Sequence, residues 1–145
     1  GDTLIVAETI AARLSAFTIG ADGTLSDRRV YAQIAPTPPL AEIDAEYTKV
    51  GYGPDGCTLD AEGCVWCGDS LHQRIARVAP GGEIVEEHPS PQEGMSIYAA
   101  MLGGEDGRTL LICVAPDWRL GMGNDEPRAS LYTARVDVPH HGGRP

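Results

Sequence analysis

The chain alternates short apolar runs with turns rich in glycine, aspartate and glutamate. Apolar residues take every second position in residues 13–19 and 72–79, which is typical of half-buried β-strands. Nearly continuous apolar runs in residues 3–8 and 109–114 predict central, buried strands. The pattern therefore predicts an all-β protein.

Turns separate the remaining predicted strands, which lie near residues 29–32, 57–59, 64–67, 83–87, 95–102 and 130–138. The connection from Pro36 to Gly53 opens with Pro36-Thr37-Pro38-Pro39, so only residues 41–47 have room for a helix. Residues 116–128 predict a polar, Gly-rich loop, and residues 140–145 predict a frayed tail.

The strand pattern repeats along the chain. In each unit a turn with an acidic residue and glycine leads into a central apolar strand, and an alternating strand follows roughly ten to twenty residues later. Four-stranded sheets that recur every ~40–50 residues are typical of β-propeller blades. We therefore predict three partial blades: residues 1–50, which lack the inner strand, residues 51–92, which are complete, and residues 93–139. A free-standing β-sandwich is the alternative.

Three partial blades do not close a ring, because propellers need about 4–8 blades. The strand in residues 3–8 would also keep an unpaired apolar edge, which promotes aggregation. We therefore expect a partner: the N-terminal half of the propeller, either as a second chain or as the missing part of the same protein.

Composition excludes several classes of partner. A net charge of −10 over 145 residues disfavours nucleic acid and anionic membranes, and no apolar run approaches the roughly 20 residues of a membrane helix. Cys64 and Cys67 stand three positions apart in a predicted strand, so they point to opposite faces and are expected to pack rather than to bind zinc. Reduced thiols and the absence of a secretory signal favour the cytoplasm.

A candidate ligand lies at Pro54-Asp55-Gly56, directly before a predicted hairpin that turns at Asp60-Ala61-Glu62-Gly63. A carboxylate at the mouth of an inner strand points into the channel where blades converge. Ca²⁺ and Mg²⁺ prefer such oxygen ligands, and Zn²⁺ tolerates them. Asp55 is therefore the candidate metal ligand and catalytic residue, although Pro-Asp-Gly is also ordinary turn chemistry.

Four further residues are candidates for the substrate pocket. Met95 and Ser96 open the next inner strand at the same level as Asp55, with core packing as the alternative. Asp69 and His72 lie between two strands of the same blade as Asp55. There His72 could carry a proton or contact a sugar hydroxyl, and a solvated loop histidine is the alternative. Glu8, which follows a central strand, is a candidate residue of the rim.

The motif Pro54-Asp55-Gly56-x-x-x-Asp60-Ala61-Glu62-Gly63-x-Val65-Trp66 resembles one in the gluconolactonase/senescence-marker-protein (regucalcin)/luciferin-regenerating-enzyme family. Gly103-Gly104-x-Asp106-x-Arg108-Thr109-Leu110 resembles that family's next blade. The opening Asp2-Thr3-Leu4-Ile5-Val6-Ala7-Glu8-Thr9, with Arg13-Leu14-x-Ala16-Phe17, resembles the blade before it. The three matches are in the right order and span nearly the whole chain.

The resemblance implies the C-terminal half of a six-bladed propeller that binds one divalent cation, with Ca²⁺, Zn²⁺, Mg²⁺ and Mn²⁺ as candidates, and that hydrolyses sugar lactones. The family's ligands are typically a Glu, an Asn and an Asp, and only the last maps onto this sequence, at Asp55. The expected function is a metal-dependent lactonase to which this chain contributes part of the active site. The alternatives are a non-enzymatic propeller scaffold that binds a cation or small molecule, and a related propeller enzyme of different chemistry.

Overall fold

The computed structural model describes residues 1–44, 47–120 and 128–142, which form ten strands and two short 3-10 helices. The strands are β1 (Thr3–Glu8), β2 (Arg13–Ile19), β3 (Leu25–Gln33), β4 (Pro54–Leu59), β5 (Val65–Asp69), β6 (Arg74–Val78), β7 (Ile84–Pro89), β8 (Met95–Gly103), β9 (Thr109–Pro116) and β10 (Ser130–Arg135). The 3-10 helices are η1 (Leu40–Glu42) and η2 (Trp118–Leu120).

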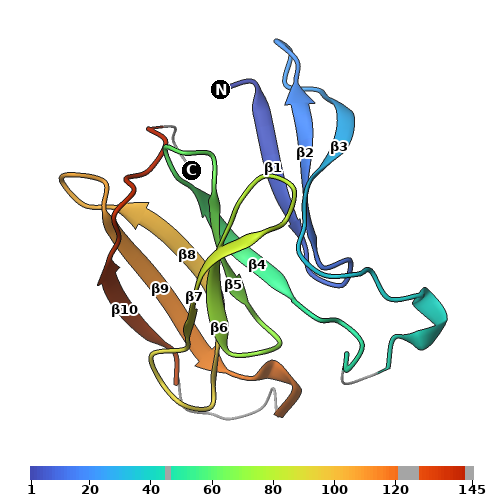
Figure 1. Ribbon diagram of the computed structural model, residues 1–145, viewed down its shortest axis with the longest axis vertical. Coiled ribbons are helices and arrows are strands. Elements are labelled where there is room, and N and C mark those ends of the chain that lie inside the picture. The colour runs from blue at the N-terminus through green and yellow to red at the C-terminus, as the bar shows by residue number, and fades with distance from the viewer. Residues whose placement is uncertain (45–46, 121–127, 143–145) are drawn as a thin grey trace.

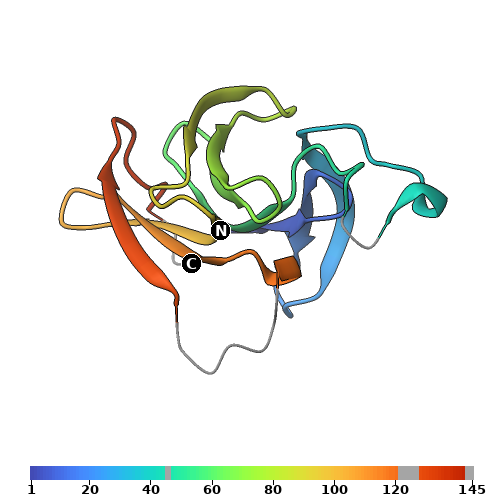
Figure 2. The same ribbon diagram turned by 90° about the horizontal axis from the view of Figure 1, so that it is seen from below.

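The strands form three antiparallel sheets that lie side by side in an arc (Figures 1 and 2). Their orders are β1-β2-β3, β4-β5-β6-β7 and β8-β9-β10, so each sheet uses strands that follow one another along the chain. This is how propeller blades are built. The predicted all-β propeller class is confirmed, and the two-sheet sandwich is not what forms.

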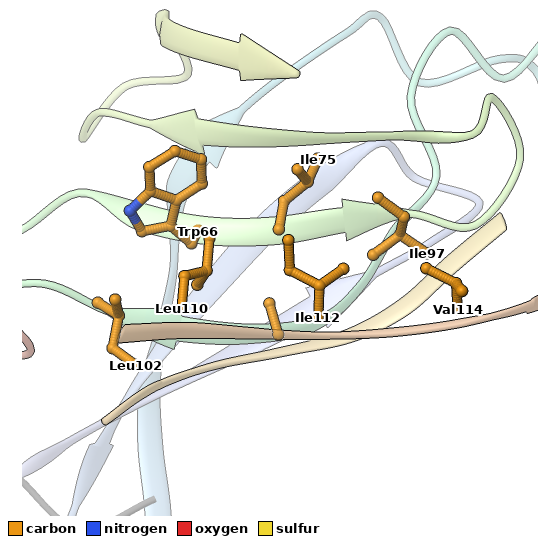
Figure 3. Packing of buried hydrophobic residues seen from close by; sticks show 8 residues of the cluster. Trp66, Ile75, Ile97, Leu102, Leu110, Ile112 and Val114 are labelled. Carbon is orange, nitrogen blue, oxygen red and sulfur yellow. The ribbon is translucent and has the colours of Figure 1, made fainter. Parts of the chain in front are cut away.

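Strand β5 of the central sheet is buried on both faces. Val65 and Cys67 of β5 pack with Leu14 of the first sheet, whereas Trp66, which lies between them, packs against the third sheet. The face of the central sheet that carries Trp66 also carries Ile75, and it packs against apolar residues of β8 and β9 (Figure 3). Alternate residues of one strand therefore serve two cores, because successive side chains of a strand point to opposite faces.

The first sheet carries an open edge in the described part of the chain. There β1 pairs with β2 alone, in a register that joins Thr3 to Thr18 and Glu8 to Arg13. The bounds of β1 and β2 are those predicted from the apolar pattern. The unpaired edge of β1 is available for hydrogen bonding to a further strand.

Two local expectations change. Residues 41–47 had room for a helix, but the described residues there form only η1, which starts after Pro39 without a side-chain cap and ends at Glu42, where Ile43 returns to extended backbone. Residues 45 and 46 lie outside the described residues. The frayed tail is wrong for residues 140 and 141, because the His140 N–H donates to Gly107 and the His141 N–H to Leu59. Among the described residues, no helix has the length and apolar character needed to cross a membrane.

Candidate active site

Asp55 lies in a β-bulge at the start of β4. Pro54 pairs with Asp69 and Cys57 with Cys67, so Asp55 and Gly56 together stand opposite the single residue Gly68. A bulge of this kind bends the strand and turns a side chain away from the regular alternation. Asp55, the candidate ligand, therefore lies at an irregular position at the start of β4.

Backbone packing explains the glycines at this bulge. A Cβ on Gly56 would lie 2.7 Å from the Ala99 Cα and from the Tyr98 oxygen, and a Cβ on Gly68 would lie 2.5 Å from the Ile97 oxygen. Strand β8 of the third sheet thus runs directly over the bulge. The two glycines are required because no side chain fits between these backbones.

The Asp55 carboxylate is half buried. Burial raises its pKa, and the backbone N–H of Gly56 offsets part of that rise. The pKa of the Cys57 thiol is raised first by burial and then by the negative charge of Asp55. No lysine or arginine pairs with Asp55 among the residues that the structure describes. In the described part of the chain, no cationic side chain therefore neutralises this carboxylate.

Asp69 anchors this end of the sheet and is fully buried. Its Oδ1 accepts hydrogen bonds from the backbone N–H groups of Gly53, Leu71 and His72, at 2.9, 3.1 and 3.2 Å. Its Oδ2 accepts from Arg74 Nε at 2.9 Å. Through these hydrogen bonds, Asp69 holds the backbone that leads into Asp55. A contact between Asp69 and the substrate stays a prediction.

His72 lies on the turn between β5 and β6, and its Nδ1 is 3.0 Å from Asp69 Oδ2. The side chain is 38% exposed. The structure thus brings His72 and Asp69 together, at the end of the sheet where β4 begins with Pro54 and Asp55.

Met95 and Ser96 begin β8, where Met95 pairs with Pro116 and Ser96 with Ala115. Met95 packs against the core between the second and third sheets. Ser96 is fully buried, and its hydroxyl has no hydrogen-bond partner in the described part of the protein. Their pocket role stays a prediction.

Glu8 is held by its own sheet. It forms ion pairs with Arg13 at 2.8 Å and Arg28 at 2.6 Å, and its pKa falls to about 2. The Ser15 hydroxyl is the largest cause of that shift, burial opposes it, and the two guanidinium groups add to it. The neighbouring Thr9 hydroxyl donates to the Pro54 oxygen at 2.9 Å, so the first sheet supports the mouth of β4.

The loop after β9 contributes residues that the sequence did not single out. Arg119 Nη2 donates to the Leu71 oxygen at 2.8 Å, and the rings of Trp118 and Tyr47 lie 5.5 Å apart. The predicted loop 116–128 therefore reaches the second sheet and the connection between the first two sheets; its residues 121–127 lie outside the described residues. In the sequence, the triplet Asp117-Trp118-Arg119 is the signal that could have identified these residues, because Asp117 pairs with Arg119 and holds it within the loop.

Comparison with known proteins identifies a relative of this chain and structures that share its fold. A relative, the 6-deoxy-6-sulfogluconolactonase of Pseudomonas putida, is 31% identical over an alignment of 112 residues, and the match covers 70% of this chain and 35% of that protein. Two solved structures, a luciferin-regenerating enzyme and the calcium-binding protein regucalcin of Agrobacterium tumefaciens strain C58, each superpose with a TM-score of 0.67.

These two structures share the fold at 16% and 18% identity, and the matches cover 96% and 97% of this chain but 43% and 44% of theirs. The chain thus spans about a third of the length of the lactonase and less than half of either solved structure. Residues 1–116 match the family model described as the SMP-30/gluconolactonase/LRE-like region. The chain belongs to the SMP-30/gluconolactonase/LRE-like family.

Proposed function

We propose that this chain supplies part of the active site of a metal-dependent hydrolase of sugar or related lactones, with Asp55 as a metal ligand and catalytic residue. The observation that carries the proposal is the half-buried Asp55 carboxylate, placed in a bulge at the mouth of β4 with no cationic side chain paired to it in the described part of the chain. The lactonase relative and the matched family favour lactones as substrates.

The chemistry of Asp55 fits a divalent cation. A carboxylate oxygen is a ligand that Ca²⁺, Mg²⁺, Mn²⁺ and Zn²⁺ all accept. The residues described form no group of three or more His, Cys, Asp or Glu side chains that could hold a metal ion, so we propose that the rest of the protein contributes the other ligands. When bound, the cation would polarise the lactone carbonyl and acidify a water molecule.

The chain's own residues would prepare this site. Asp69 and Ser70 hydrogen-bond to the backbone of Gly53, the residue directly before β4, and the Thr9 hydroxyl donates to the Pro54 oxygen. The open edge of β1 would pair with a strand of the other half of the propeller. That association would complete the ring of blades around Asp55.

The test replaces Asp55→Asn in the complete protein that carries this chain, because asparagine keeps the shape of the side chain and removes the charge. We expect affinity for divalent cations, measured by calorimetry, to fall by more than the roughly 10–100-fold that follows loss of an outer-shell partner. Lactone hydrolysis, followed by acid release, should be lost with it. Asp22→Asn, in the exposed turn between β2 and β3, is the matched control.

The outcomes separate the candidate functions. If the Asp55→Asn protein keeps both cation binding and turnover, the proposal is wrong. If the wild-type protein binds a cation through Asp55 but hydrolyses no lactone, it is a cation-binding scaffold. The calcium-binding description of regucalcin makes that the second candidate.

A further inference from the structure

We propose that His72 and Asp69 form a proton-transfer pair in this site, with His72 as the general base and acid of lactone hydrolysis and Asp69 as its positioning residue. The inference rests on the proposed lactonase function. It adds a group that the metal site does not include, and it follows from the hydrogen bonds of the turn between β5 and β6.

The surroundings of Asp69 fix which nitrogen of His72 carries the proton. Three backbone N–H groups and Arg74 Nε already donate to this carboxylate, so it acts as an acceptor. An acceptor needs a donor opposite, and His72 Nδ1 stands 3.0 Å from Oδ2. Neutral His72 therefore carries its proton on Nδ1 and has its lone pair on Nε2.

The free nitrogen is accessible. The Asp69 side chain is 0% exposed and that of His72 is 38% exposed, so a buried carboxylate orients a ring that reaches solvent. Nε2 makes no hydrogen bond within the described residues. Asp69 thus anchors the turn and also orients the imidazole, and a proton-transfer histidine needs such a second partner to set its tautomer and orientation.

The turn is fixed at the end of the sheet where Asp55 lies. Asp69 binds the N–H of Gly53, and Ser70 donates to the Gly53 oxygen through its N–H at 2.9 Å and its hydroxyl at 3.2 Å. Gly53 is two residues before Asp55 along the chain. Figure 1 shows the start of β4 and the β5–β6 turn at the same, lower end of the sheet.

Charged groups surround the pair from three elements. Arg74 of β6 contacts Asp69 and also pairs with Glu87 of β7 at 3.0 Å. Arg119, from the loop after β9, donates to the Leu71 oxygen and pairs with Asp117. Arg74 offsets the charge of Asp69, so Asp69 acts on His72 through the contact at Nδ1, which holds the ring and its tautomer in place.

The proposed step conserves atoms and charge. A water oxygen forms a bond to the lactone carbonyl carbon while one water proton passes to His72 Nε2. The bond between that carbon and the ring oxygen then breaks, and the imidazolium returns the proton to the departing ring oxygen as a hydroxyl group. The product is the open-chain hydroxy acid, and His72 ends in its starting form.

The experiment compares His72→Ala with His88→Ala in the complete protein, using D-glucono-1,5-lactone as the probe. His88 is the matched control because it is another exposed histidine beside a carboxylate, Glu86, on the outer strand β7. Turnover is measured between about pH 5 and pH 8, where a histidine changes charge. Cation affinity is measured on the same proteins, and imidazole is added to each.

We expect kcat to fall about 100-fold or more in His72→Ala, with cation affinity unchanged and the pH dependence flattened. Added imidazole should restore part of the turnover, which a purely structural loss would not allow. His88→Ala should match the wild type. If His72→Ala keeps turnover within about threefold of the wild type, or loses it together with cation binding and without rescue, the pair is not the proton carrier. If the wild type hydrolyses no lactone with any divalent cation, the proposed function itself fails.

Discussion

Asp60 closes the β4–β5 hairpin, and replacing it tests what stabilises the central sheet. Its Oδ1 accepts from the N–H groups of Glu62 and Cys64, both at 2.9 Å, and its Oδ2 accepts from Arg77 Nε at 2.7 Å. The Asp60 side chain is 0% exposed and that of Arg77 is 13% exposed. The perturbation is Asp60→Asn, which keeps the shape and removes the charge.

The expected cost follows from these contacts. Asparagine has one side-chain oxygen, which can still serve the two backbone N–H groups, but its amide then opposes Arg77 donor to donor. Removing one partner of a buried ion pair costs about 3–5 kcal/mol. Because Arg77 keeps its contact with Glu62 at 2.8 Å, we expect the lower end of that range. About 3 kcal/mol corresponds to a change of roughly 100-fold in the unfolding equilibrium.

The assay is urea unfolding of the complete protein together with hydrogen exchange of peptides from β4 to β6. The control is Glu62→Gln, because Glu62 contacts the same Arg77 but is 64% exposed, and exposed pairs contribute at most about 1 kcal/mol. Asp60→Asn should speed exchange across β5 and β6, whereas Glu62→Gln should leave it nearly unchanged. The reasoning is refuted if the two variants cost the same, or if Asp60→Asn costs less than about 1 kcal/mol.

Two further predictions concern the frame of the site. Gly56→Ala should destabilise the protein by about 1–3 kcal/mol in the same unfolding assay, because its Cβ would meet the β8 backbone at 2.7 Å; Gly103→Ala, where no atom lies within 4 Å, should be milder, and equal costs would contradict the close approach. Glu8→Gln should lose stability near neutral pH but not near pH 2. The folded pKa of Glu8 is depressed from 4.5 to about 2, so its stabilisation is present above pH 4.5 and disappears as pH falls through 2. Unfolding curves at several pH values measure this, and a difference that persists at pH 2 would contradict it.

Local patterns were sufficient to predict the strands. Strands β1 and β2 have the predicted bounds because an apolar run or alternation, followed by turn residues, determines them without distant contacts. The tail expectation failed for the opposite reason. Residues 139–141 are anchored by hydrogen bonds to Leu59, Ala61 and Gly107, which lie far away in the sequence.

The bulge at Asp55 also depends on distant contacts. Turn chemistry explained Pro54-Asp55-Gly56 equally well, and only the passage of β8 over Gly56 and Gly68 shows why these two positions have no side chain. The pairing of Asp69 with Arg74 follows from the register between β5 and β6, which joins these residues directly. A sequence pattern predicts that two strands form, but their register depends on the turn and on the packing of both faces.

Strand order accounts for the difference between Asp55 and the two buried aspartates of the same hairpin. Arg77 neutralises Asp60 and Arg74 neutralises Asp69, and both arginines belong to β6. Strand β6 pairs with the side of β5 that faces away from β4, and Asp55 sits in the bulge before the regular β4–β5 register resumes at Cys57. A partly buried carboxylate is costly without an opposite charge. Within the described chain β6 supplies no such charge to Asp55, and this favours a cation that comes from outside the sheet.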